Sequence, residues 1–325
     1  MLTFTKWNKL PSELRKHGLS FCENCDLLQY AQLSKLCNKE IQRFNTVVLK
    51  YVDVHQMDNC STICAEYSTG KIFYCRFLVV NENTHKLIRT MPYTIEYHEN
   101  VRDNPVLRGN AHRSAIKYLE EFLKCRTKIG EMRVDCKEWL YEEFERIPTI
   151  FKVMKWKVQI YPNMLDTFLN FMYETTKVSS LHLNVHSPLW DLVCLPSKFF
   201  ESMFFKQLME ARFEIKGNIS NKDFLICDTQ SLELECDTIS DAAINKKLRQ
   251  WCEGDVTMKS FRIVLLNRVA NSEVVLQDLQ FEAKPNDCFE IQGRGGKKGT
   301  VHSYVRGASL SSVVIFKTGV RFIPW

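Results

Sequence analysis

QSLELECDTISDAAINKKLRQWCEGDVTMKSFRIVLL, residues 230–266, predicts a strand, a helix and a second strand in direct succession. Leu232 and Leu234 alternate with polar residues, which is the period of a half-buried strand. In the middle of the stretch apolar residues recur at helical spacing as far as Trp251, and Gly254 is placed to end that helix. The closing KSFRIVLL is again strand-like, so a helix returns the chain from one strand to the next.

The same alternation of helix and strand runs through most of the chain after residue 111. Predicted strand centres fall near residues 133, 158, 182, 214, 233 and 262, separated by uneven steps of about 19 to 32 residues. This is the approximate period of a leucine-rich-repeat-like solenoid, in which each strand and its return helix form one unit. No consensus asparagine ladder accompanies the repeat, so a more compact α/β domain remains the alternative. Residues 274–323 are again strand-like, and we expect them to cap the last repeat.

Upstream of this repeat the apolar period changes. The expected elements are helices in 10–45, strands at 46–54 and 71–80, a turn at 68–70 and a connecting loop at 99–110. The predicted fold class is α+β/α/β, with a small N-terminal helical module followed by an irregular leucine-rich-repeat-like β/α solenoid that has a β-rich C-terminal end. The predicted parts are the N-terminal module 1–45, a β-rich connecting region 46–110 and a recognition domain 111–325.

The composition is that of an ordinary folded protein with a mildly basic surface. Of the 325 residues, 45% are hydrophobic and 25% are charged, and the formal net charge is +6. Basic residues are interleaved with acidic ones, which argues for a mixed-charge surface and against a dedicated nucleic-acid binder. No apolar run is long enough for a signal peptide or for the ~18 residues of a membrane span. We therefore expect a cytoplasmic or nuclear protein without membrane contact, whose cysteines mostly act as small buried apolar residues.

Two pairs of cysteines are spaced closely enough to suggest metal ligands. Cys22 and Cys25 form a CxxC, and Cys60 and Cys64 form a second pair. A structural zinc site needs four convergent ligands, usually from two tight knuckles with glycine-containing turns, and neither pair has such a turn. The sequence also has no GxSxG, HExxH or other catalytic signature. We therefore expect no metal, no cofactor and no catalytic residue.

The HxxxH of His182 and His186 lies in a segment with the period of a strand. Four residues along a strand span roughly 13 Å, which is too far for two ligands of one metal ion. Asn184 lies between the histidines on the same predicted face, opposite Leu181 and Leu183. We interpret this polar face as exposed to solvent or available to a partner.

GRGGKKGT, residues 293–300, has glycines that invite comparison with a phosphate-binding loop. A P-loop places Lys directly after its second glycine and then Ser or Thr at the start of a helix, whereas Thr300 opens an alternating strand pattern. The favoured interpretation is a hairpin turn with a basic tip formed by Arg294, Lys297 and Lys298. Contact of this tip with RNA or another anion is left open.

LPSELRKHGLSFCENCDLLQYAQLSKLC, residues 10–37, carries more apolar positions than a short terminal module can bury. Pro11 and Glu13 are typical of the first turn of a helix, and Asp26 is placed to cap a second helix. Part of this surface should therefore meet the following domain or another protein.

This segment resembles an F-box, whose pattern opens with Leu-Pro-x-Glu-Leu and continues with Asp-Leu-Leu and Ser/Cys-Lys. The resemblance implies that these residues dock on a Skp adaptor: Leu10, Pro11, Glu13, Leu14, Leu19, Asp26, Leu27, Leu28, Leu33 and Cys37. Arg15, Gly18 and Cys22 stand where apolar residues are usual, which implies a looser first helix and weaker adaptor binding.

The C-terminal part is similar to nematode F-box proteins that carry a type 2 F-box-associated or FTH domain. The similar pieces are INKKLRQWCEG, MKSFRIVL and CFEIQGRGGKKGTVHSYV. The resemblance implies a substrate-recognition subunit of a Skp–cullin–F-box ubiquitin ligase, a non-catalytic protein whose C-terminal domain binds a target protein that the sequence does not name. The alternatives are a repeat-type interaction protein whose F-box-like end caps its own core, and weak RNA or anion binding through the turn at 293–299.

Overall fold

The fold is that of a computed structural model of the chain. It describes residues 10–20, 37, 47–68, 70, 72–90, 106–123, 127–136, 152–174, 178–186, 193–215, 217–236, 238–305 and 311–318. The chain forms two compact units, Met1–Trp156 and Lys157–Trp325. The division falls inside strand β7 (Lys152–Ile160).

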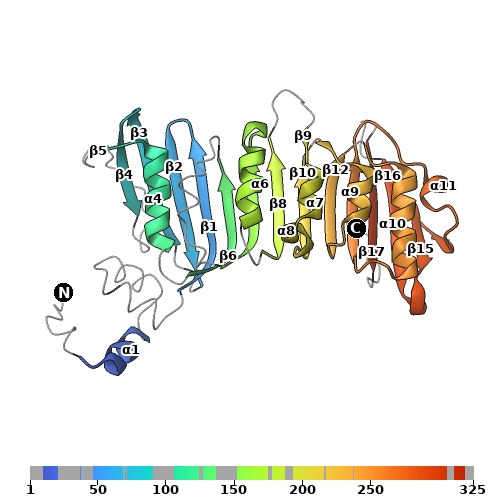
Figure 1. The fold of residues 1–325 in the computed structure, drawn as a ribbon, viewed down its shortest axis with the longest axis horizontal. Helices are drawn as coiled ribbons and strands as arrows, with labels where there is room; N and C mark the ends of the chain where they lie inside the picture. The colour runs from blue at the N-terminus through green and yellow to red at the C-terminus, as the bar shows by residue number, and fades with distance from the viewer. Residues whose placement is uncertain are drawn as a thin grey trace. The chain divides into compact units, whose positions relative to one another are not determined.

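The N-terminal unit is built on a sheet in which an antiparallel meander is extended by one parallel strand. Its other elements are α1 (Ser12–Ser20), β1 (Val47–Met57), β2 (Cys60–Tyr67), β3 (Ile72–Asn81), β4 (Thr84–Thr90), β5 (Val106–Arg108), α4 (Ala111–Leu123) and β6 (Thr127–Asp135). Strands β1 to β5 pair in sequence order, and β6 lies parallel to β1. Helix α4 packs on one face of this sheet, in front of β2 and β3 in Figure 1. There the Tyr118 ring stacks on Phe73 with ring centroids 6.1 Å apart.

Two strands of this unit differ from the sequence prediction. Strand β2 fills the stretch between the strands predicted at 46–54 and 71–80, where Ile63 and Ala65 are buried. Apart from the buried Tyr67 at its end, its other residues are small or polar, so its apolar signal is weak. Strand β5 lies inside the loop predicted at 99–110, and its three residues are all exposed, so no hydrophobic pattern marks it.

The C-terminal unit combines parallel and antiparallel strands. Strands β8, β10, β12 and β13 pair in parallel and in sequence order, and β17, β16, β15 and β14 continue the sheet with antiparallel pairing. Strands β9 and β11 form a separate small parallel pair. The elements of this unit are η3 (Pro162–Met164), α6 (Leu165–Glu174), β8 (Ser180–Val185), β9 (Val193–Cys194), α7 (Ser197–Glu201), α8 (Met203–Lys206), β10 (Glu210–Glu214), β11 (Gly217–Asn218), α9 (Asn221–Ile226), β12 (Ser231–Cys236), α10 (Asp241–Glu253), β13 (Ser260–Leu265), α11 (Ser272–Val275), β14 (Phe281–Lys284), β15 (Cys288–Gln292), η4 (Arg294–Gly296), β16 (Lys298–Val305) and β17 (Ser312–Thr318).

Helices α6 to α10 lie on one face of this sheet, as Figure 1 shows. The core between helices and strands is rich in aromatic rings. Phe199 of α7 lies with its ring centroid 5.2 Å from that of Phe205 and 5.8 Å from that of Phe213. Trp251 of α10 meets Phe316 of β17 at 4.9 Å between ring centroids. Burial of large apolar side chains, at ~1.5–3 kcal/mol each, is what holds the helices to this face.

The chain is therefore a mixed α/β protein in which strands dominate. The strands predicted near 182, 214, 233 and 262 are confirmed by β8, β10, β12 and β13, and the β-rich C-terminal end is confirmed by β14 to β17. Because β6 pairs with β1, strands from the predicted regions 46–110 and 111–325 share one sheet. The domain boundaries at residues 45 and 110 stay predictions.

Candidate functional site: the open strand face

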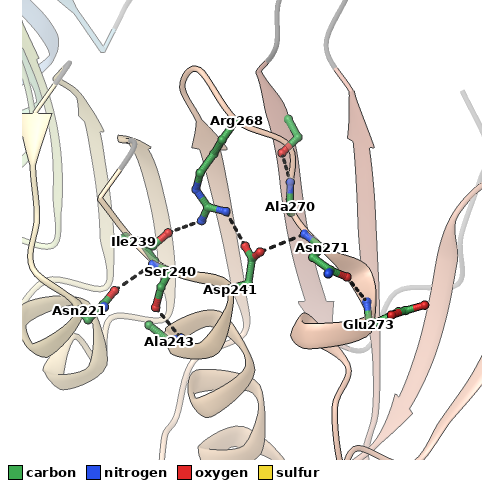
Figure 2. Close-up of polar contacts among 10 residues, drawn as sticks. Asn221, Ile239, Ser240, Asp241, Ala243, Arg268, Ala270, Asn271 and Glu273 are labelled. Carbon is green, nitrogen blue, oxygen red and sulfur yellow. Dashed lines mark hydrogen bonds and ion pairs between the residues drawn. The ribbon is translucent and has the colours of Figure 1, made fainter.

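The edge of the C-terminal unit where parallel strands end and the next helices begin is the first place to look for a ligand. In open α/β sheets ligands bind outside the carboxyl ends of the strands, and helix N-termini attract anions. Figure 2 shows this edge, and its polar groups bind one another. Ser240 caps α10 by accepting a hydrogen bond from the Ala243 N–H at 3.2 Å. The N–H of Ser240 itself donates to Asn221 Oδ1 at 2.9 Å.

Asp241, the first residue of α10, ties this edge to the following segment. Its Oδ1 accepts a hydrogen bond from Arg268 Nη1 at 2.7 Å, and its Oδ2 accepts one from the Asn271 N–H at 3.0 Å. The second terminal nitrogen of Arg268 donates to the carbonyl oxygen of Ile239. Asn271 in turn caps α11 by accepting from the Glu273 N–H at 3.0 Å.

The strand-end edge, comprising Asn221, 238–241 and 268–273, is thus a polar ladder that joins successive strand–helix units. Thr238 extends it, because its Oγ1 accepts from the Ile219 N–H at 3.2 Å and donates to the Ile219 carbonyl at 2.9 Å. The sequence shows no asparagine consensus, yet mixed Asn, Asp, Thr and Arg side chains build a ladder. Since the chain's own groups occupy these positions, the edge is structural and the candidate functional site lies elsewhere.

The face of the same sheet that points away from the helices carries polar side chains at alternate positions. In β8, Leu181 and Leu183 are buried, whereas His182 and Asn184 are half-buried on the other face. This alternation confirms the polar face predicted from the sequence, and β10 and β12 repeat it. We call this surface the open strand face, and its members are His182, Asn184, Arg212, Glu214, Ser231, Glu233, Glu235, Ser260, Arg262, Thr300, His302 and Lys317.

Glu214 is the centre of an ion network on this face. Its Oε1 lies 2.6 Å from Arg212 Nη2 and 3.2 Å from His182 Nε2. Its Oε2 accepts a hydrogen bond from Asn184 Nδ2 at 3.1 Å. Arg212 Nε lies 3.2 Å from Glu233 Oε2, so the network crosses β8, β10 and β12. Partly exposed pairs of this kind contribute only ~0–1 kcal/mol each, so the network organises the surface more than it stabilises the fold.

The environment fixes the charge of two groups in this network. Burial lowers the pKa of His182 below 6.5, Glu214 opposes the shift, and Arg212 and Lys157 add to it. His182 is therefore neutral at pH 7. Burial raises the pKa of Glu214, but His182 and Arg212 lower it further than burial raises it, so the net pKa lies below 4.5. Glu214 is accordingly a carboxylate at neutral pH.

Lys247 of α10 is a buried cation that the sequence analysis did not single out. It is 1% exposed, and its Nζ donates to the carbonyl oxygens of Leu225 (2.9 Å) and Cys227 at the end of α9. Burial lowers the pKa of Lys247, and the nearby Cys227 and Asp228 oppose the shift. Because it is enclosed and bonded to backbone carbonyls, Lys247 caps α9 and has no access to a ligand. Its position three residues after Ile244, on the apolar stripe of α10, is the signal that could have found it.

The structure describes part of the predicted adaptor-binding segment. Helix α1 follows directly after Leu10, which is half-buried, and Pro11, which is exposed. Within α1, Glu13 is exposed, Leu14 is 55% exposed and Leu19 is 2% exposed.

The remaining predicted positions are divided between described and undescribed parts of the chain. Cys37 is helical and half-buried. Arg15 and Gly18, where the F-box pattern usually has apolar residues, both lie within α1. Four predicted docking residues lie outside the described residues: Asp26, Leu27, Leu28 and Leu33. Cys22, the third position that differs from the F-box pattern, also lies outside them.

The second cysteine pair lies along one strand. Cys60 and Cys64 are both in β2, one buried and the other half-buried, and four residues of strand separate them by roughly 13 Å. That distance is too long for one metal ion to bridge. Cys22 and Cys25 lie outside the described residues. Among the residues that the structure does describe, no three His, Cys, Asp or Glu side chains gather as a metal site.

Residues 293–297 of the glycine-rich stretch form the turn between β15 and β16, as the hairpin interpretation predicts, and Lys298 and Gly299 begin β16. Gly295 and Gly296 have φ values of 72° and 77°, which favour glycine. A Cβ at Gly293 would lie 2.9 Å from the Trp251 ring, so close packing accounts for that glycine. Lys298 Nζ lies 2.6 Å from Glu290 Oε1, which ties one of the three basic side chains back to the hairpin. Binding of RNA or another anion at this tip stays a prediction.

Comparison with known proteins adds no relative. The chain matches no family model, no curated protein and no solved structure. Within the described ranges, no helix combines the length and the apolar content that crossing a membrane requires.

Proposed function

We propose that this chain is a substrate-recognition adaptor of a Skp–cullin–F-box ubiquitin ligase, with no catalytic role of its own. The observation that carries the proposal is helix α1, which starts directly after Leu10 and Pro11 and leaves Leu14 55% exposed. An exposed leucine on a short helix is the kind of anchor that a helix-binding partner buries, at ~1.5–3 kcal/mol per side chain. The F-box-like pattern that continues to Cys37 supplies the rest of the docking surface.

In the same proposal the C-terminal unit is an irregular leucine-rich-repeat-like solenoid that holds a target protein. Its support is that β8, β10, β12 and β13 follow one another both in sequence and in the sheet, while the strand-end edge joins successive units. Solenoids present a continuous strand surface to partners, and here that surface is the open strand face. Holding the target beside the ligase raises the effective concentration for ubiquitin transfer, in the cytosol or the nucleus.

The test of the proposal is co-purification of the full chain with a Skp adaptor. Replacing Leu10, Pro11 and Leu27 together with Ala should abolish the complex, because the apolar anchors of the docking surface are removed. The circular dichroism melting of the C-terminal unit should stay unchanged. The matched control is Val80→Ala with Val106→Ala, which truncates two exposed apolar residues of the N-terminal unit elsewhere and should leave the complex intact. Persistent binding by the triple variant would remove the assignment of this surface.

A second candidate is a repeat-type interaction protein outside any ligase, whose N-terminal segment caps its own core. Leu19, 2% exposed, is the observation that favours it, because this side chain is already buried within the chain. A truncation that starts near residue 46 separates the two candidates. An adaptor should remain folded and soluble without its docking module, whereas a chain that needs this segment as a cap should aggregate.

A further inference from the structure

The lysines of the antiparallel strands β14 and β16 that lie beside the open strand face are paired with acids. Lys284 pairs with Glu282 on β14, and Lys298 pairs with Glu290 across β15 and β16. Among the parallel strands, Arg212 is held by two glutamates. A cation in the middle of the sheet that has no acidic partner of its own would therefore be available to bind another molecule.

Two cations in the middle of this sheet have no such partner. Arg262 of β13 is half-buried and Lys317 of β17 is exposed, and neither side chain makes an ion pair or a hydrogen bond with a described residue. Glu233 lies opposite Arg262 in the register, but its carboxylate lies 3.2 Å from Arg212 instead. Glu235, diagonal to Arg262, also forms no ion pair with it among the described residues.

The register places these two cations side by side. Arg262 is opposite Ile315, and Lys317 is opposite Ser260, two residues earlier in β13. Diagonal neighbours of this kind on one face of an antiparallel pair lie about 7–8 Å apart. The spacing matches two acidic side chains at positions i and i+2 of an extended segment, which are separated by about 6.6 Å.

The hydroxyl group of Ser231, on the strand next to Arg262, adds one further donor. Ser260 Oγ donates to Ser231 Oγ at 3.0 Å, which leaves the hydroxyl hydrogen of Ser231 available to an acceptor. Thr300 lies opposite Lys317 on the other side, but its Oγ1 donates to the Lys317 carbonyl oxygen at 3.4 Å, so its hydroxyl hydrogen is already used. Arginine, lysine and hydroxyl donors within one small area favour carboxylate oxygens.

We propose that Arg262 and Lys317 form a subsite for an extended acidic segment of a partner protein, with carboxylates at alternate positions. This inference rests on the proposed function, for which it specifies the chemistry of the bound target. On one side the positive area ends at β13, because Glu233 and Glu235 lie on the next strand, β12, and Glu214 lies on the strand beyond it, β10. A short segment with two carboxylates fits on β13 and β17, whereas a long polyanion such as RNA that also crosses β12 is repelled by these acids.

The test uses the full chain and fluorescein-labelled peptides at low ionic strength, where surface charges are least screened. The probe is an octapeptide of alternating Glu and Thr, and its control is the same peptide with Gln in place of Glu. Fluorescence anisotropy should show binding of the Glu peptide only. The variant Arg262→Gln with Lys317→Gln should weaken that binding by about tenfold, as expected when two charge-assisted contacts are lost.

The matched control is Arg294→Gln with Lys297→Gln, which changes the net charge by the same amount at the glycine-rich tip. It should alter the affinity by less than about twofold, because it leaves Arg262 and Lys317 in place, whereas general attraction to a basic protein would fall equally in both variants. Equal losses in both variants, or equal binding of the Gln peptide, would overturn the inference. Unchanged thermal melting of both variants ensures that a loss of binding reports on the subsite.

A separate readout distinguishes failure of this inference from failure of the proposed function. The Arg262→Gln, Lys317→Gln variant should co-purify with the Skp adaptor as well as the unaltered chain does. If the adaptor never binds but the peptide result holds, the subsite stands and the ligase role falls. If the adaptor binds and the peptide does not, the subsite is wrong and the ligase role stands.

Discussion

The strand-end edge and the open strand face of the C-terminal unit use the same kinds of residues in opposite ways. At the edge, Asp241 and Arg268 bond to each other and also to backbone groups of the next segment. On the face, Arg212 and Glu214 bond only to other side chains, and about half of the Arg212 side chain is exposed. The edge therefore fixes the positions of whole elements, whereas the face fixes only the directions of side chains.

This difference distinguishes polar groups that hold the fold from polar groups that can bind a partner. A polar group whose bonds end on the backbone cannot be released to a partner without loosening the fold. A side-chain pair on a half-exposed strand can exchange partners at little cost. The two regions therefore predict different results for substitutions of similar chemistry.

The largest expected effect is at the edge. Asp241→Ala should lower the free energy of unfolding of the C-terminal unit by about 2–4 kcal/mol, because it leaves Arg268 Nη1 and the Asn271 N–H without their acceptor and the Arg268 charge without its carboxylate. Urea denaturation followed by circular dichroism measures the change. Glu201→Ala is the matched control, since the Glu201 carboxylate lies 3.5 Å from Lys222 with both side chains more than half exposed. A loss at Asp241 no larger than at Glu201 would contradict the assignment of the edge as structural.

A smaller effect is expected on the face. Arg212→Ala breaks two ion pairs at once, to Glu214 and to Glu233, yet it should cost only about 0.5–1 kcal/mol because the side chain is exposed. The same urea experiment compares it directly with Asp241→Ala. A loss as large as that at the edge would show that the network on the face also holds the sheet together.

The smallest expected effect is a change in pH dependence. Burial lowers the pKa of His182; Glu214 opposes this shift, and Arg212 and Lys157 add to it. The unfolded chain therefore binds a proton at His182 more tightly than the folded protein does. The free energy of unfolding should therefore fall as the pH drops below 6.5, and His302 contributes in the same direction because burial and Lys317 lower its pKa.

His182→Gln should make the free energy of unfolding less dependent on pH in that window than it is in the unaltered protein. Urea midpoints measured at neutral pH and at mildly acid pH give both slopes. If the free energy of unfolding depends on pH equally in the His182 variant and in the unaltered protein, burial of His182 does not lower stability at acid pH.

The sequence predicted the parallel part of the fold because its strands and helices have strong periods. The alternation in β8 and β12 and the stripe of α10 ending at Gly254 were all visible as patterns. The apolar residues that follow Pro196 form two short helices, α7 and α8, because Ser202 adopts an extended backbone and accepts from the Phe205 N–H to cap α8. Such a break depends on local hydrogen bonding that apolar periodicity does not reveal.

The candidate site was harder to predict than the elements that carry it. The polar face around His182 followed from alternation alone, but the pairing of Arg212 with Glu214 and Glu233 depends on which strands are neighbours. The isolation of Arg262 and Lys317 likewise depends on the antiparallel register between β13 and β17. Residues far apart in the chain meet on this face, so no local motif marks them.

The central claim is that the N-terminal segment docks on a Skp adaptor while the open strand face remains free for a target. Sedimentation velocity of the purified chain mixed with a purified Skp adaptor tests it most directly. The account predicts a one-to-one complex for the unaltered chain and for Arg262→Gln with Lys317→Gln. No complex should form when Leu10, Pro11 and Leu27 are all replaced by Ala. Separate sedimentation of the unaltered chain and the adaptor at micromolar concentrations would contradict the account.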